Sequence, residues 1–266
     1  MSVLESGPVS DALIITWRNL KRIPRIPELA IFAVLQSIMF VLLFAYVFGG
    51  AIPLPGGGSY NEFLMPGIFV QTIAFASATT AIGVADDMGK GLIDRFRSLP
   101  MARSAVLTGR TVAGVIGLAG ILVVLMLAGL VVGWRVNNGF AKFMFAVVLL
   151  LAFAYVMAWI GVWIGLSVPN TETAQQLTFV TIFPLTFISN VFVPPASLPA
   201  VLQPIAEWNP VSTLTASCRE LFGNPNPTIG TAFPSQHPIE VTIIWAIVLI
   251  AIFAPLAVRK YRNTSR

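Results

Sequence analysis

Six long apolar runs alternate with short polar segments along the chain, and none of the six contains a charged residue. A helix needs about 20 apolar residues to cross the hydrocarbon core of a bilayer. One charge at the bilayer centre costs about 2.5–3.5 kcal/mol on insertion scales. The pattern therefore predicts six membrane-spanning helices, over residues 29–48, 63–85, 111–134, 143–168, 174–193 and 241–258.

The composition supports a membrane protein. Hydrophobic residues make up 56% of the chain and charged residues only 10%, whereas a soluble domain carries about 25% charged residues. The formal net charge is +5, but the basic residues flank apolar runs and form no continuous stripe. This favours lipid headgroups and a cytoplasmic partner over nucleic acid. Cys218 is the single cysteine, so no intrachain disulfide forms.

Most Lys and Arg residues lie in three clusters: before the first run, between the second and third, and after the last. Basic residues beside membrane spans stay on the cytoplasmic side. We therefore expect both termini and the loop 86–110 to face the cytoplasm, which agrees with an even number of spans. The N-terminus lacks the pattern of a signal peptide, so the first run is expected to remain as a span. The expected location is the plasma (inner) membrane.

The segment before the first run predicts an amphipathic helix over residues 10–25. Leu13, Trp17 and Leu20 recur at i, i+4 and i+7 and form one apolar face, while Arg18 lies on the other side. Pro24 then ends the helix. Such a helix lies in the inner membrane interface.

The cytoplasmic loop 86–110 predicts a short docking helix. Leu92, Phe96 and Leu99 lie at i, i+4 and i+7, Asp94 projects elsewhere, and Pro100 stops the helix. A narrow apolar edge between charged flanks fits a cleft on a soluble protein. The residues alone leave open a second interpretation, in which the helix rests on lipid headgroups.

Residues 194–225 form an external segment that is too long for a simple turn. Helical spacing over residues 198–205 and 211–218, interrupted by Pro204 and Pro210, predicts two short re-entrant helices that dip into the outer leaflet. Irregular backbone at that depth must be buried in protein or face a water-filled cavity. The alternative is a folded cap without a role in transport.

The predicted spans contain no Asp, Glu, Lys, Arg or His, which argues against a proton-coupled transporter and a channel with charged rings. Uncharged polar residues concentrate in the second and fifth spans, and there they predict a pathway lining. The candidates are Gln71, Thr72, Thr79, Thr178, Thr186, Ser189 and Asn190. The alternative is hydrogen bonding between helices, typically about 0.6 kcal/mol each. Gly161 and Gly165 in the fourth span predict close helix packing.

Three motifs carry a resemblance to a known family. The strings WRNLKRIPRIPEL, GLIDRFRSLPMARSAVLTGR and FPLTFISNVFVPPASLPAVLQPIAEWNPVSTLTASCRELFG resemble, in order, the interfacial helix, the coupling segment and the fifth span with external helices of ABC-2 permeases. The daunorubicin/doxorubicin-resistance branch is the most similar. The resemblance implies that the coupling segment sits in a groove on an ATPase subunit. The implied contacts are Leu92, Asp94, Arg95, Phe96, Arg97, Ser98, Leu99, Pro100 and Arg103.

The expected fold is therefore an all-α polytopic membrane protein with six transmembrane helices, an interfacial helix, a cytoplasmic coupling helix and external re-entrant helices. The chain has no GxxxxGK[ST] run to bind nucleotide phosphates. The family resemblance implies a separate partner ATPase in two copies, which would bind ATP and Mg²⁺. We expect no cofactor, metal or enzymatic activity in this chain. A second permease copy or a sister permease completes the expected assembly.

The expected function is export of an amphipathic drug-like or lipid-like molecule, driven by the partner ATPase. Two alternatives remain open at this point. The cargo is a lipid-linked glycan in the first, and in the second the chain is a membrane scaffold or sensor that transports nothing.

Overall fold

The computed structural model describes residues 8–20, 27–48, 54, 57–91, 103–227 and 232–263. These residues form helices joined by short connections, and no strand occurs among them, which confirms the all-helical class. In chain order the helices are α1 (Pro8–Leu20), α2 (Pro27–Leu42) continued by the π-helix η2 (Leu43–Phe48), α3 (Tyr60–Gly89), α5 (Arg103–Val131), α6 (Gly139–Ser167), α7 (Thr171–Phe187), the 3₁₀ turn η3 (Pro195–Ser197), α8 (Gln203–Trp208), α9 (Pro210–Phe222), α10 (Phe233–Gln236) and α11 (Pro238–Asn263).

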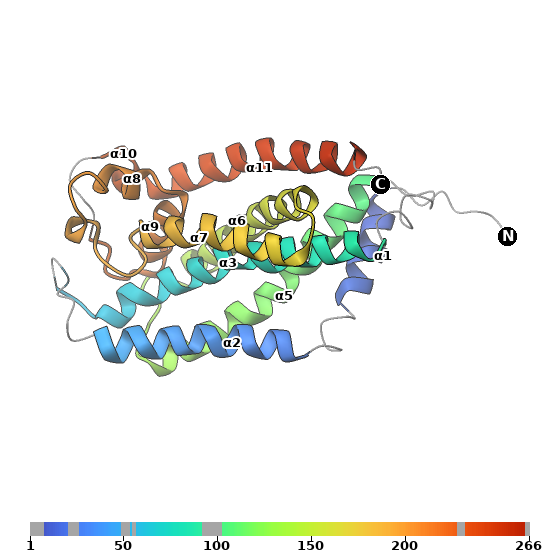
Figure 1. The fold of residues 1–266 in the computed structure, drawn as a ribbon. Coiled ribbons are helices and arrows are strands. Elements are labelled where there is room, and N and C mark those ends of the chain that lie inside the picture. Colours follow the sequence, from blue (N-terminus) through green and yellow to red (C-terminus); the bar gives the residue numbers. More distant parts are fainter. Residues whose placement is uncertain are drawn as a thin grey trace.

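The long helices run along one bundle axis around α3 (Figure 1). α3 packs against α6 and α7, and α6 also packs against α11. The short helices α8, α9 and α10 gather at one end of the bundle, whereas α1 and the C-terminal end of α11 lie at the other end (Figure 1). We call these the outer end and the inner end. The first described helix, α1, and the end of the last, α11, thus share one end of the bundle.

Four helices are long and apolar enough to cross a membrane: α3, α6, α11 and the Val106–Val131 part of α5. In chain order, α3, α5, α6 and α11 correspond to the second, third, fourth and sixth predicted spans. The first predicted span corresponds to α2 with η2, in which the apolar stretch Val34–Val47 is shorter. The fifth corresponds to α7, which has only 17 residues.

α7 ends six residues before the predicted end of the fifth span, at Phe187 instead of residue 193. Pro184 lies in its last turn and has no N–H for the helical ladder. Residues 188–193 then continue without regular structure, and we call them the unwound segment. The composition of this segment is apolar enough for a membrane helix. The sequence pattern alone therefore predicts that the fifth span continues through it.

Two glycines bring α6 directly against α3. A Cβ on Gly161 would collide with the carbonyl oxygen of Ser77, and a Cβ on Gly165 would collide with that of Ala81. Only glycine leaves room for the two backbones at this distance. The close packing predicted for the fourth span is therefore confirmed.

The N-terminal helix α1 is shorter than the predicted range 10–25, because it ends at Leu20, and residues 21–26 lie outside the described part of the chain. Ile15 and Thr16 are buried, and the Thr16 hydroxyl donates to the Gly109 carbonyl of α5 at 3.1 Å. Leu13 and Trp17, which belong to the predicted apolar face, are more than 60% exposed. These two side chains of the predicted apolar face are therefore largely exposed on the surface of the described part of the chain.

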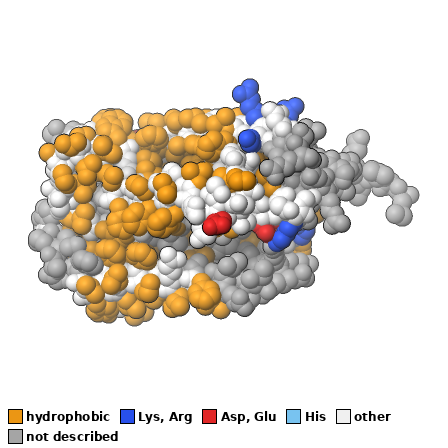
Figure 2. Space-filling model, viewed as in Figure 1, with side chains coloured by type: hydrophobic (Ala, Val, Ile, Leu, Met, Phe, Trp, Pro, Cys, Tyr) orange, Lys and Arg blue, Asp and Glu red, His pale blue; other side chains and the backbone are white. Residues whose placement is uncertain are grey.

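Hydrophobic side chains cover most of the visible surface, and Lys and Arg side chains cluster toward the inner end (Figure 2). Large apolar side chains of α2, α5, α7 and α11 are exposed along the bundle. A soluble protein rarely exposes an apolar area of this extent. The surface is therefore suited to lipid.

Candidate functional site

The structure describes the helices on either side of the predicted coupling segment, which meet in a junction at the inner end. Residues 92–100 are outside the described residues, and Arg103 begins α5 with a side chain that is also outside them. On either side of this gap, the Asp87 carboxylate of α3 and the Arg110 guanidinium of α5 form an ion pair. Arg110 also lies over Gly83, where a Cβ would collide with it. The two helices that carry the coupling segment are thus fastened to each other.

The predicted pathway residues of α7 face the interior of the bundle. Thr178 and Thr186 are fully buried, and Ser189 is 1% exposed. The Thr178 hydroxyl donates to the Ala174 carbonyl at 2.7 Å, and the Thr186 hydroxyl donates to the Ile182 carbonyl at 3.1 Å. These hydroxyls are satisfied by their own helix. A pathway role for them stays a prediction.

The predicted pathway residues of α3 lie in different environments. Gln71 is buried, Thr79 is exposed, and Thr72 is half-buried. The Thr72 hydroxyl donates to the Ile68 carbonyl at 2.8 Å and lies 3.5 Å from the Ser37 hydroxyl of α2. The structure therefore does not gather the three side chains at one point of α3.

The opposite face of α7 carries a row of aromatic rings that the sequence analysis did not single out. Phe179, Phe183 and Phe187 follow at i, i+4 and i+8, with ring centroids 5.1 and 4.2 Å apart. The three side chains are 39–53% exposed. The spacing is visible in the sequence, but without the structure it cannot be assigned to a surface.

This row continues across the unwound segment to the first membrane helix. Phe187 lies 5.3 Å from Phe192, and Phe192 stacks on Phe44 of η2 at 4.2 Å. We call Phe179, Phe183, Phe187, Phe192 and Phe44 the aromatic row. At its inner end lies a surface hollow of about 410 Å³. The residues lining it are Glu172, Gln175, Gln176, Phe179 and Val180.

The backbone of the unwound segment is satisfied by side chains from other parts of the chain. The Asn209 amide donates to the carbonyls of Leu185 and Ile188, both at 2.7 Å. The Tyr60 hydroxyl donates to the Phe192 carbonyl at 3.0 Å. Buried backbone groups without partners are costly, so these donors make the irregular backbone possible.

Arg219 on α9 supplies the remaining donors to the unwound segment. Its side chain is fully buried, and its Nη2 donates to the carbonyls of Asn190 and Val191 at 2.8 and 3.2 Å. Its Nε donates to the Phe63 carbonyl of α3 at 2.8 Å, and the guanidinium lies 3.6 Å from the centre of the Phe63 ring. Burial lowers the pKa of Arg219 to about 9, so the group remains charged at neutral pH.

Local sequence explains why α9 presents Arg219 in this position. The Asn209 side chain caps the helix by accepting from the Val211 N–H at 2.8 Å, and Pro210 occupies the first helical position. Gly223 ends the helix in the left-handed conformation, with φ 76°. Pro204 similarly lies in the first turn of α8. The two prolines therefore begin the external helices instead of interrupting them.

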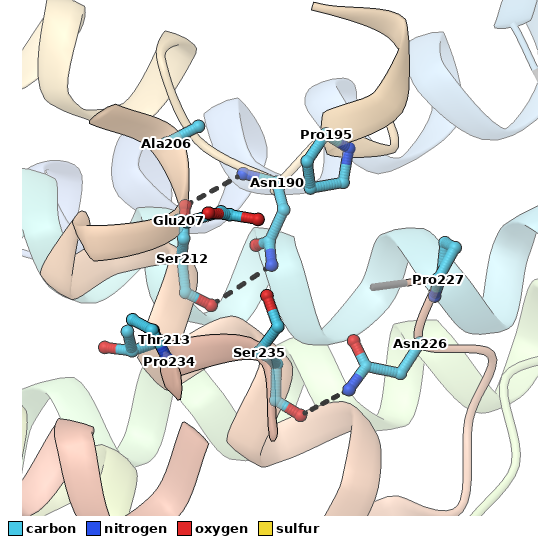
Figure 3. Close-up of a pocket in the computed structure, with 11 residues that line it drawn as sticks. Asn190, Pro195, Ala206, Glu207, Ser212, Thr213, Asn226, Pro227, Pro234 and Ser235 are labelled. Carbon is cyan, nitrogen blue, oxygen red and sulfur yellow. Dashed lines mark hydrogen bonds between the residues drawn. The ribbon is translucent and has the colours of Figure 1, made fainter. Parts of the chain in front are cut away.

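A small cavity lies beside the unwound segment (Figure 3). Its volume is about 20 Å³, enough for one water molecule. Asn190 lines it and is tied to α9, because its N–H donates to the Ser212 hydroxyl at 3.1 Å and its side-chain amide donates to the Ser212 carbonyl at 3.2 Å. This cavity is too small for a drug-sized molecule. Among the described residues no cluster of His, Cys, Asp and Glu is arranged to hold a metal.

Arg219 is the site residue that sequence reasoning missed. It is the only Lys or Arg between Lys142 and Arg259, and it directly follows the uncharged stretch 208–218. That isolation is a usable signal, since a cation within an apolar element generally has a specific partner. Its partners, however, are backbone carbonyls distant in sequence.

The comparison with known proteins identifies the family. A family model described as ABC-2 type transporter matches residues 11–222. The chain belongs to the ABC-2 type transporter family. The daunorubicin resistance ABC transporter permease protein DrrB1 of Streptomyces coeruleorubidus is 32% identical over 255 residues, covering 96% of this chain and 87% of that protein. The ABC-2 resemblance stated from the sequence motifs is thereby confirmed.

Two further ABC-2-like relatives show the breadth of the similarity. The probable doxorubicin resistance ABC transporter permease protein DrrC of Mycobacterium tuberculosis is 25% identical, covering 97% of this chain and 90% of that protein. The putative transport permease ycf38 of Porphyra purpurea is 24% identical, covering 75% of this chain and 69% of that protein. This chain is thus a membrane component of an ABC transporter.

Proposed function

We propose that this chain is the permease subunit of an ATP-driven exporter that moves an amphipathic drug-like or lipid-like molecule out of the cell. The observation that carries the proposal is the ABC-2 family match over residues 11–222. The names of two relatives, which refer to daunorubicin and doxorubicin resistance, support a drug-like cargo. ATP and Mg²⁺ would be bound by a separate ATPase subunit.

In the proposed topology six helices cross the inner membrane: α2 with η2, α3, α5, α6, α7 and α11. The inner end faces the cytoplasm, with α1 in the membrane interface. Arg259, Lys260 and Arg262 at the end of α11 support this orientation, because that end of α11 lies at the inner end together with α1 (Figure 1), where Lys and Arg side chains cluster on the surface (Figure 2). Cations stay on the cytoplasmic side. The external helices would cover the opposite side.

The proposed coupling segment, residues 92–100 with Arg103, would dock in a groove of the ATPase. The ion pair between Asp87 and Arg110 supports this role, since it joins the two helices on either side of the segment. The hydrogen bond from Thr16 to Gly109 connects the same junction to α1. A displacement of the coupling segment would therefore reach α3, α5 and α1 together.

The proposed assembly contains two ATPase subunits and two permeases, the second being another copy or a sister chain. We infer that the cargo passes along the aromatic row of α7 and η2. The exposed rings of Phe179, Phe183 and Phe187 suit the apolar part of an amphipathic molecule. Glu172 and Gln175 at the inner end suit its polar part. The polar pathway candidates lie on α3 and α7 or directly after α7, and they remain part of the proposal. They are Gln71, Thr72, Thr79, Thr178, Thr186, Ser189 and Asn190.

A charge reversal in the coupling segment tests the proposal. Phe96→Asp combined with Arg97→Glu should abolish drug-stimulated ATP hydrolysis and efflux in the reconstituted complex, while membrane insertion stays normal. The matched control is Phe140→Asp with Lys142→Glu, an exposed pair of the same chemistry at the start of α6. Full efflux by the coupling variant would refute the docking role.

The aromatic row has its own test. Phe183→Ala should lower efflux of an amphipathic aromatic probe roughly two- to tenfold, the range expected from losing one aromatic contact of about 0.5–1.5 kcal/mol. Phe145→Ala on α6 is the control, because that ring is exposed to a similar extent, 43% against 39%. Equal effects of the two variants on efflux would remove the aromatic row from the pathway.

A further inference from the structure

Arg219 joins elements that are far apart in the sequence. Its donors reach the first turn of α3 through Phe63 and the unwound segment through Asn190 and Val191. Among the described residues no carboxylate lies within ion-pair distance of it, so carbonyl dipoles and the Phe63 ring stabilise its charge. Pulling these groups apart would leave a charge and several carbonyls unpaired in a protein interior, which is costly.

Two further contacts hold the same elements together without Arg219. A Cβ on Gly67 of α3 would lie 2.6 Å from the Val191 carbonyl oxygen, so the backbones of α3 and the unwound segment are in close contact. The Tyr60 hydroxyl binds the next carbonyl, that of Phe192. The outer end of α3 and the unwound segment therefore form one packed unit.

α9 is also attached to elements on its other sides. The buried hydroxyls of Ser217 on α9 and Thr242 on α11 lie 3.1 Å apart. The N–H of Asn137, between α5 and α6, donates to the Phe222 carbonyl at 2.7 Å. By contrast, α2 exposes a broad apolar face and meets these elements through side chains: its Ser37 hydroxyl is 3.5 Å from Thr72 of α3, and Phe44 of its continuation η2 stacks on Phe192.

We propose that Arg219 is a positioning residue that holds α9, the unwound segment and the outer end of α3 in one rigid block, and that the outer side opens by movement of α2 against this block. α9 then does not lift away during transport. The inference rests on the proposed transport function, but one of its tests does not require a transport measurement.

The first test uses Cys218, the chain's single cysteine, which is fully buried next to Arg219. In vesicles containing the complete transporter, maleimide labelling of Cys218 should be equally slow with ATP and with ADP, within twofold. In the Arg219→Lys variant, Cys218 should be labelled at least tenfold faster than in the wild type. The lysine ammonium group lacks the planar fork of donors that reaches all three carbonyls. Arg135→Lys is the control, since Arg135 also binds two carbonyls but near the surface.

The second test uses two hydroxyl pairs as crosslinking sites in a Cys218→Ala background. Oxidation of Ser217→Cys with Thr242→Cys should leave efflux within twofold of the same protein in reduced form. Oxidation of Ser37→Cys with Thr72→Cys should lower efflux at least tenfold relative to its own reduced form. Disulfide formation is measured by the loss of free thiols.

Three results would overturn the rigid block. They are ATP-dependent labelling of wild-type Cys218, an Arg219→Lys labelling rate equal to wild type, and reversible arrest of efflux by the Ser217–Thr242 crosslink. Efflux unaffected by the Ser37–Thr72 crosslink would overturn the role of α2. A failure of the proposed transport function is distinguishable from a failure of the rigid block. In the first case the reduced proteins would transport no probe, while the labelling rate of Cys218 would still report on the block.

Discussion

The two ends of the bundle are held together by different chemistry. At the outer end, irregular backbone is buried and receives hydrogen bonds from Tyr60, Asn209 and Arg219. At the inner end, regular helices meet through an ion pair between Asp87 and Arg110, whose side chains are 12% and 22% exposed. A buried network fails as a unit when one member is lost, whereas a partly hydrated ion pair contributes less. We therefore expect substitutions at the outer end to lower stability more than substitutions at the inner end.

The largest effect is expected when the outer network loses its charge. Arg219→Met keeps the length of the side chain but leaves the buried carbonyls of Asn190 and Val191 without this donor, at about 1–3 kcal/mol for each. We expect a loss of at least about 2 kcal/mol in the free energy of unfolding, measured by denaturant unfolding in detergent micelles. Arg135→Met, which changes an arginine near the surface, should cost far less. Similar losses of unfolding free energy for the two variants would contradict a larger contribution of the outer network to stability.

An intermediate effect is expected from crowding the contact between α3 and the unwound segment. Gly67→Ala places a methyl group against the Val191 carbonyl, and overpacking of this kind costs about 1–3 kcal/mol. Gly120→Ala in α5 is the matched control, because no atom lies within 4 Å of the added Cβ. Thermal unfolding monitored by size-exclusion chromatography should separate the two variants. If Gly67→Ala were as stable as the control, the contact would be looser than described.

The smallest effect on stability is expected at the inner end. Asp87→Asn removes the charge that pairs with Arg110, and a partly exposed ion pair contributes about 1 kcal/mol. The unfolding temperature should change little, but drug-stimulated ATP hydrolysis should fall several-fold if the junction transmits force. Asp86→Asn, which disturbs the more exposed pair with Lys90, is the control. Equal ATP hydrolysis in the two variants would contradict the transmission role of the junction.

Much of the bundle was predictable because long uncharged runs leave few alternatives. The predicted spans 63–85, 143–168 and 241–258 each lie within or nearly within α3, α6 and α11. These helices continue beyond the apolar runs, since Glu62 and Arg259 are tolerated at the membrane surface and still form helix. An apolar run therefore predicts which residues of a helix suit lipid, but it does not predict the residue at which the helix ends.

The outer site was less predictable because its determinants are distant in sequence. Residues 188–193 are apolar enough for a membrane helix, and they unwind because Asn209, Arg219 and Tyr60 supply donors from other segments. A single sequence does not reveal those pairings. The face of α7 was also ambiguous, since Thr178 and Phe179 are neighbours and only packing against α3 decides which of them is buried.

The glycine contacts between α6 and α3 have a consequence for biogenesis. α3 leaves the ribosome well before α6 is synthesised, so the backbone groove that receives Gly161 and Gly165 stays open until the later helix arrives. Insertion of α3 into the bilayer and its pairing with α6 are therefore separate events. A bulkier residue at either glycine would let the nascent chain enter the membrane and arrest it there, as an inserted but unassembled protein exposed to quality-control proteases.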